Sequence, residues 1–102
     1  MGRPRATRIP IDLPAVLDGH SGRDYRITNL SLGGVFVTGV TLAIDTRVGI
    51  MFTAPPHVPE FHAACTTRWS TAEGTGLSFD DLPSADVDRL AYLIRYVLSR
   101  MQ

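Results

Sequence analysis

The chain has 102 residues, 44% of them hydrophobic, which is enough for one domain whose core needs neither a metal nor a disulfide to fold. Ten basic residues, all arginine, balance ten acidic ones, and this zero net charge argues against general binding to DNA, RNA or an anionic membrane, because those partners favour a broad positive surface. The single cysteine, Cys65, excludes an internal disulfide and a cysteine-based zinc site. No apolar run approaches the roughly 20 residues that span a bilayer, so we expect a cytoplasmic protein without membrane insertion.

The first seven residues form a polar, arginine-rich segment that is interrupted by Pro4. Arg3 and Arg5 lie within this segment, and Arg8 follows it directly before the first apolar alternation. Polar chain termini of this kind are mobile unless a partner holds them. We therefore expect residues 1–7 to form a flexible cationic arm and residues 8–102 to form the folded domain.

Six short β-rich runs follow the arm, separated by clusters of turn-forming residues. The first run contains Pro10 and Pro14, which indicates an edge position or a bulge. The prolines of residues 54–59 should end the fourth run, and residues 73–75 should connect the last two. No helical segment separates the runs, so the pattern predicts a mainly β fold, a six-stranded antiparallel β-barrel. The expected strands are residues 8–17, 25–30, 35–38, 47–52, 61–69 and 76–79.

From Ser84 onward, the apolar residues recur at helical spacing and form a stripe that should pack on the barrel. Ser84 is the expected N-cap, because its hydroxyl can accept a hydrogen bond from a backbone N–H of the first turn. Leu93 and Tyr96 lie beside the stripe, where they either mark a partner surface or, more ordinarily, are scattered exposed residues. The stripe consists of Val87, Leu90, Ala91, Ile94, Leu98 and Met101.

The connection between the second and third expected strands combines an amide, a hydroxyl and two glycines. Asn29 and Ser31 are two residues apart, so on a strand their side chains would share one face and could hydrogen-bond to the edge of a base. Gly33 and Gly34 would let the backbone turn tightly and approach a ligand. Arginines can bind phosphate oxygens and also the O6 and N7 edge of guanine. With the cationic arm, this segment suits a guanine nucleotide, although a polar hairpin beside a solvated tail is the simpler interpretation.

This segment resembles a motif of the PilZ domain family, whose members are receptors for the bacterial second messenger cyclic di-GMP. The motif consists of Asp or Asn, any residue, Ser, two further residues and Gly. It is complete here as Asn29, Ser31 and Gly34, and the apolar residues 35–37 that usually accompany it follow. The resemblance covers most of the chain and implies a PilZ-like β-barrel with a C-terminal α-helix.

PilZ domains also carry two arginines, separated by three residues, on a loop before the first strand. Arg8 matches the second arginine, Pro4 occupies the position of the first, and Arg3 and Arg5 flank that position. The resemblance implies that cyclic di-GMP orders the arm and that the domain then signals to an unidentified protein partner. The alternative is a degenerate PilZ-like interaction module that binds no nucleotide. The expected ligand-binding residues are Arg3, Arg5, Arg8, Asn29, Ser31, Gly33 and Gly34.

The remaining reactive side chains give no indication of an enzyme. The three histidines do not have the spacing of metal ligands, and Ser31 lacks the glycine-flanked turn of a serine nucleophile. Trp69 ends a β-rich run, so we expect it in the core or at its rim, although Arg68 beside it could reach a ligand. We therefore expect a binding protein without catalytic residues, cofactor or metal.

Overall fold

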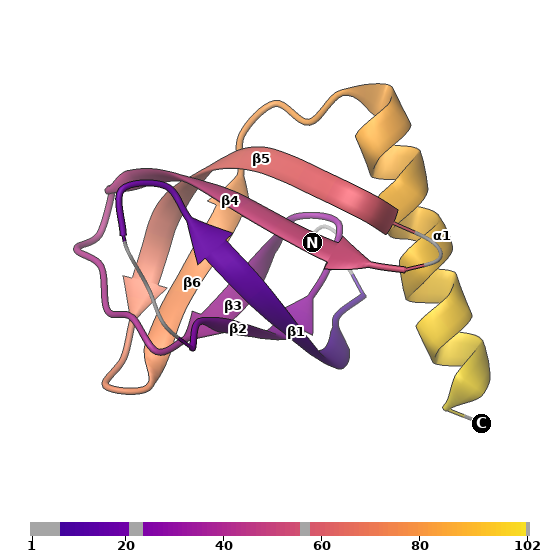
Figure 1. The fold of residues 1–102 in the computed structure, drawn as a ribbon, viewed down its shortest axis with the longest axis horizontal. Coiled ribbons are helices and arrows are strands. Elements are labelled where there is room, and N and C mark those ends of the chain that lie inside the picture. The colour runs from indigo at the N-terminus through magenta and orange to yellow at the C-terminus, as the bar shows by residue number, and fades with distance from the viewer. Residues whose placement is uncertain (1–6, 21–23, 56–57, 102) are drawn as a thin grey trace, which may run out of the picture.

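The computed structural model describes residues 7–20, 24–55 and 58–101. Within these residues, six antiparallel strands close into a barrel in the order β1-β2-β3-β6-β5-β4, and a single helix follows (Figure 1). The expected fold class, a six-stranded antiparallel barrel with a C-terminal helix, is therefore confirmed. The elements are β1 (Ile9–Leu17), β2 (Arg26–Leu30), β3 (Gly34–Thr38), β4 (Arg47–Ala54), β5 (Val58–Ser70), β6 (Gly74–Phe79) and α1 (Ser84–Arg100).

The barrel interior is filled by the inward-facing residues of all six strands. Strand β4 shows the alternation most clearly, because Val48, Ile50 and Phe52 are buried and the residues between them are not. The Phe52 and Phe61 rings meet across β4 and β5 with their centroids 4.9 Å apart. Burial of an aromatic or aliphatic side chain contributes roughly 1.5–3 kcal/mol, so this packed interior is the main source of stability.

The strand boundaries differ from the sequence-based ones mainly around β5. This strand begins at Val58 and includes Pro59, because Val58 pairs with Ala54 of β4 although prolines lie between the two strands. The turn before β6 comprises residues 71–73 and so lies two residues earlier than the expected 73–75. Its Thr71 hydroxyl accepts hydrogen bonds from the backbone N–H groups of Glu73 and Gly74. Of the two alternatives for the prolines of β1, an edge position or a bulge, the structure shows an irregularity, a register shift between Pro10 and Leu13 in a strand of the closed barrel.

Helix α1 packs against the barrel through Leu90, Leu93 and Ile94, and it contacts β1 and β5. The expectation that Leu93 lies off the buried stripe is wrong, because the stripe is centred between Leu90 and Ile94. Met101 follows the last helical residue and is exposed. Among the described residues, no helix is long and apolar enough to cross a membrane.

The N-terminus of α1 also differs from the expected one. Its N-cap is Pro83, whose backbone is extended (φ −60°, ψ 152°), and Ser84 is the first helical residue. No side chain caps the helix, so the predicted capping role of Ser84 is wrong. The φ angle of a proline is fixed near −65°, a value that already suits this position, and the Pro83 carbonyl accepts the first helical hydrogen bonds, from Asp86 and Val87.

Candidate functional site

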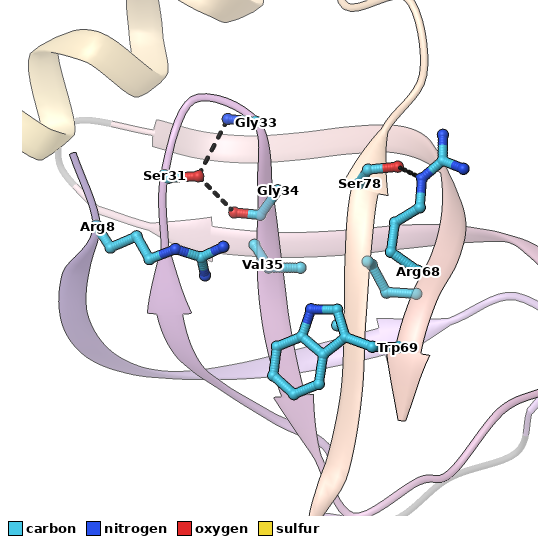
Figure 2. Close-up of a pocket in the computed structure, with 10 residues that line it drawn as sticks. Arg8, Ser31, Gly33, Gly34, Val35, Arg68, Trp69 and Ser78 are labelled. Carbon is cyan, nitrogen blue, oxygen red and sulfur yellow. Dashed lines mark hydrogen bonds between the residues drawn. The ribbon is translucent and has the colours of Figure 1, made fainter. Parts of the chain in front are cut away.

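A pocket of about 360 Å³ lies on the barrel surface where the residue before β1 approaches β3, β6 and β5 (Figure 2). Four of the seven predicted ligand-binding residues line it, namely Arg8, Ser31, Gly33 and Gly34. The predicted residues Arg3 and Arg5 lie outside the described residues. The complete lining is Arg8, Ser31, Gly33, Gly34, Val35, Arg68, Trp69, Gly76, Leu77 and Ser78.

Ser31 shapes the turn between β2 and β3. Strand β2 ends at Leu30, so Ser31 lies in the turn and does not share a strand face with Asn29, contrary to the expectation. Its side chain is buried, and its hydroxyl accepts a hydrogen bond from the Gly33 N–H (3.1 Å) and donates one to the Gly34 carbonyl (3.5 Å), as Figure 2 shows. The serine of this motif therefore fixes the backbone of the turn that borders the pocket.

Asn29 positions Arg8. The Arg8 Nη1 donates a hydrogen bond to the Asn29 Oδ1 over 3.2 Å, which links the residue before β1 to strand β2. Both β-strands are paired at this point, because Ile9 lies opposite Leu30 and Pro10 lies opposite Asn29. The backbone beside Arg8 is therefore held by strand pairing, and the exposed Arg8 side chain lines the pocket.

The two glycines of the turn have different surroundings. A Cβ atom on Gly34 would overlap the Leu77 carbonyl oxygen and would lie 3.0 Å from the Ser78 Cα, so Gly34 permits the close pairing of β3 with β6. A Cβ atom on Gly33 would meet only the Ser31 Oγ, at 3.8 Å. Gly34 is therefore required by backbone packing, whereas Gly33 borders the open space of the pocket.

Trp69 forms one wall of the pocket, so of the two expected positions, core or rim, the structure shows the rim. Its side chain is 43% exposed and stacks on Phe36 of β3, with ring centroids 5.0 Å apart and planes 19° apart. Gly76 of β6 pairs with both residues, and the indole lies across it so closely that a Cβ atom there would overlap the ring. Gly76 thus leaves space for the indole, which packs on Phe36 and is open to the pocket.

A β-bulge explains why Trp69 points outward. The buried residues Cys65 and Thr67 have the same strand parity as Trp69, so regular alternation would place the indole inside the barrel. The register of β5 on β6 shifts between Thr67 and Trp69, and Arg68 and Trp69 are both exposed. The extra residue rotates the end of the strand and brings two consecutive side chains to the same pocket.

Arg68 adds a second positive charge to the pocket. Its Nε donates a hydrogen bond to the Ser78 Oγ over 2.9 Å, which attaches the side chain to β6. Figure 2 shows Arg8 on one side of the pocket and Arg68 with Trp69 on the other. None of the described lining residues is acidic, so the two guanidinium groups give the pocket a positive potential. Sequence reasoning noticed the pair Arg68-Trp69 but did not include it in the site.

Other chemistry is not supported within the described residues. They contain no group of three or more histidine, cysteine or acidic side chains that could hold a metal ion. Cys65 is buried in the core, where burial, together with the nearby charge of Asp80, raises the pKa of its thiol to about 12. A thiol with that pKa stays protonated at neutral pH and is a poor nucleophile.

Comparisons with known proteins agree with this architecture. The family model of the PilZ domain matches residues 3–99. Among solved structures, the Bacillus subtilis inhibitor of motility (MotI/DgrA) has the same fold with a TM-score of 0.80 and 18% sequence identity, and the match covers all of this chain and 55% of that one. The chain thus spans about half the length of that protein. No curated protein matches it. Because the family match includes nearly the whole chain, the protein belongs to the PilZ domain family, whose members are non-catalytic binding modules and typically receptors for cyclic di-GMP.

Proposed function

We propose that this PilZ domain binds cyclic di-GMP in the pocket between Arg8 and Trp69. The observation that carries the proposal is the arrangement of two arginines around an exposed indole that stacks on Phe36, in a pocket whose described lining includes no acidic residue. Cyclic di-GMP offers the complementary groups, which are two phosphate charges and two flat purine bases. The turn at Gly33 leaves room for a ligand to approach the backbone.

The arginines would bind the charged and polar edges of the ligand. A guanidinium donates paired hydrogen bonds to phosphate oxygens or to the O6 and N7 atoms of guanine. The hydrogen bond from Arg8 to Asn29 is exposed and 3.2 Å long, so a charged phosphate can replace or share it at small cost. Asn29 then serves mainly to hold Arg8 near the pocket, and its own contact with a base is a secondary prediction.

Trp69 would stack on one guanine. Stacking of a base on an aromatic side chain contributes about 1–3 kcal/mol. The indole is already fixed by Phe36 and by the backbone of Gly76, so little conformational freedom would be lost when the base binds. This preorganisation supports a ligand with a flat ring over one that carries phosphate alone.

Arg3 and Arg5 belong to the second part of the proposal, which concerns the response to the ligand. We infer that the N-terminal arm closes over the bound phosphates and so creates a new surface for a protein partner. Ordering each residue of the arm costs roughly 1–2 kcal/mol, which the charge-assisted hydrogen bonds of the arginines must offset. The Bacillus subtilis protein with this fold is longer than this chain, and we infer that the output here passes to another chain or another segment.

Titration calorimetry tests the binding step. We expect cyclic di-GMP to bind with micromolar or better affinity, whereas GMP and cyclic di-AMP bind much more weakly, because each lacks part of the complementary chemistry. Trp69 is the only tryptophan, so a change of its fluorescence on binding would report stacking in this pocket. Absence of heat and of a thermal shift at ligand concentrations near a millimolar would contradict the receptor function.

The substitution Arg8→Ala tests the site, with Arg89→Ala as a matched control on the exposed helix surface. We expect Arg8→Ala to weaken binding at least about tenfold, since a hydrogen bond to a charged group contributes roughly 1.5–3 kcal/mol. Arg89→Ala should bind like the parent protein. Equal affinities of the two variants would show that the ligand binds elsewhere.

The second candidate function is an interaction module that binds no nucleotide. It is favoured by Pro4, which stands where the family motif has its first arginine. If neither the parent nor a Pro4→Arg variant binds cyclic di-GMP, this second function is the better account. If only the variant binds, the pocket is intact and the missing arginine alone explains the loss.

A further inference from the structure

The outward face of α1 carries aromatic and charged side chains in a symmetric pattern. Tyr92 is 52% exposed at the middle of this face, and Tyr96 is 39% exposed one turn later. Asp88, Arg89 and Arg95 are exposed around them. Figure 1 shows α1 at the edge of the molecule, with one side on the barrel and the other directed away from it. Tyrosine and arginine are enriched at protein interfaces and often dominate their binding energy.

The pattern is centred on Tyr92. At about 100° per residue, Asp88 (four residues before) and Arg95 (three after) lie on one flank of Tyr92, and Arg89 and Tyr96 lie on the other flank. The small, exposed residues Ala85 and Ser99 lie two turns before and two turns after it. Reversal of the helix direction therefore places an acid opposite a base on one flank and a guanidinium opposite a tyrosine ring on the other.

We propose that this face binds a second copy of the chain, with the two α1 helices antiparallel and Tyr92 at the two-fold axis. In such a pair, equivalent flanks face one another, so Asp88 of each copy meets Arg95 of the other. The two residues differ in height by about one residue, or roughly 1.5 Å, which side chains can span. Parallel pairing would instead bring Asp88 of each copy beside Arg89 of the other, so an exchange of the charges at Asp88 and Arg95 distinguishes the two arrangements.

The other flank adds a contact between Arg89 and the ring of Tyr96. The ring already accepts a guanidinium within the helix, because Arg100 lies 5.6 Å from its centroid. Arg89 lies within 3.7 Å of an Asp86 oxygen, an ion pair that keeps its side chain along the helix. Ala85 and Ser99 allow the two backbones to approach on either side of the central tyrosines. Every contact occurs twice, as a two-fold interface requires.

The expected association is weak. A single pair of 17-residue helices buries less than the roughly 1,200 Å² of the smallest stable interfaces. We therefore expect a dimer with a dissociation constant in the micromolar to millimolar range, which weakens when salt rises because the ion pairs are exposed. Ligand binding is not required, since the pocket residues do not belong to this face.

Sedimentation velocity of the protein from about 10 µM to 1 mM tests the proposal, because this range covers the dissociation constants expected for the dimer. Asp88→Arg should weaken the dimer at least about tenfold, because the substitution replaces two attractive pairs with two repulsive ones. The double variant Asp88→Arg, Arg95→Asp should restore it, because the charges are then exchanged. Glu73→Arg, an equal charge change in the exposed turn before β6, should leave association unchanged.

Helix content measured by circular dichroism identifies any variant that fails to fold, and Tyr92→Arg offers a second disruption at the axis. A monomer at every concentration would overturn the proposal. A dimer that is indifferent to both Asp88→Arg and Tyr92→Arg would show that another surface associates. Failure of the double variant to restore the dimer would refute the antiparallel register.

Discussion

Replacement of Gly34 by alanine should destabilise the protein although glycine and alanine differ by one methyl group. The new Cβ would lie 3.0 Å from the Leu77 carbonyl carbon and the Ser78 Cα and closer still to the Leu77 carbonyl oxygen. These are backbone atoms of β6, so no side chain can move aside and β3 must separate from β6. Overpacking costs typically 1–3 kcal/mol, and we expect a loss of about 3 kcal/mol here because the obstacle is backbone.

Gly33→Ala is the matched control. Its nearest neighbour would be the Ser31 Oγ at 3.8 Å, an ordinary contact, so the free energy of unfolding should change by less than about 0.5 kcal/mol. Urea denaturation measures both variants, and a loss of about 3 kcal/mol corresponds to a decrease of roughly 12–24 °C in Tm for a domain of this size. The reasoning is refuted if Gly34→Ala is as stable as the parent, or if Gly33→Ala loses as much stability as Gly34→Ala. Gly33→Ala should nevertheless weaken the binding of cyclic di-GMP, because Gly33 borders the pocket.

Three further predictions concern the ligand and the core. Trp69→Ala should weaken binding of cyclic di-GMP by about 1–3 kcal/mol while Trp69→Phe retains most of the affinity, and calorimetry that finds no loss for alanine would exclude stacking. Pro4→Arg should strengthen binding, because it restores the spacing of the family motif to Arg8; an unchanged affinity would indicate that Arg3 or Arg5 already supplies the charge. The Cys65 thiol should not react with a thiol reagent at pH 8 until the protein unfolds. Rapid labelling of the native protein would contradict this. Because the pKa of the thiol is raised from 9.0 to about 12 in the folded protein, the unfolded thiol ionises at lower pH than the folded one. The free energy of unfolding should therefore decrease as the pH rises from about 9 towards 12.

The fold could be predicted because local patterns agree with the final structure along most of the chain. Val48, Ile50 and Phe52 alternate with less buried residues, and the structure places all three in the barrel interior. The helical periodicity after residue 84 likewise leads to a helix that packs through Leu90 and Ile94. These signals depend only on which face of an element is buried, and that information is written in the spacing of apolar residues.

The site was less predictable because it depends on departures from regular spacing. Trp69 has the strand parity of the buried Thr67, and only the bulge between them turns the indole to the surface. No local residue pattern predicts this bulge, because it arises from the pairing of β5 with β6. Ser31 shows the same limit, because its role depends on where β2 ends and not on its spacing from Asn29. The family motif pointed to Arg8, Asn29, Ser31 and Gly34 but not to Arg68 or Trp69, and only the structure shows what these residues contact.

The pairing of β3 with β6 lies beneath the pocket and helps to close the barrel. Strand β6 pairs with its neighbour β5 and also with β3, where Gly34 lies opposite Ser78, so the seam between β3 and β6 joins segments that are distant in the sequence. Contacts of this kind form slowly, because a long loop must first be closed. Arg8 directly precedes β1, whereas the opposite wall of the pocket is on β5 and β6. A molecule bound between these walls would join the two sides of the seam. Its concentration should therefore determine how long the barrel stays closed as well as how often the pocket is filled.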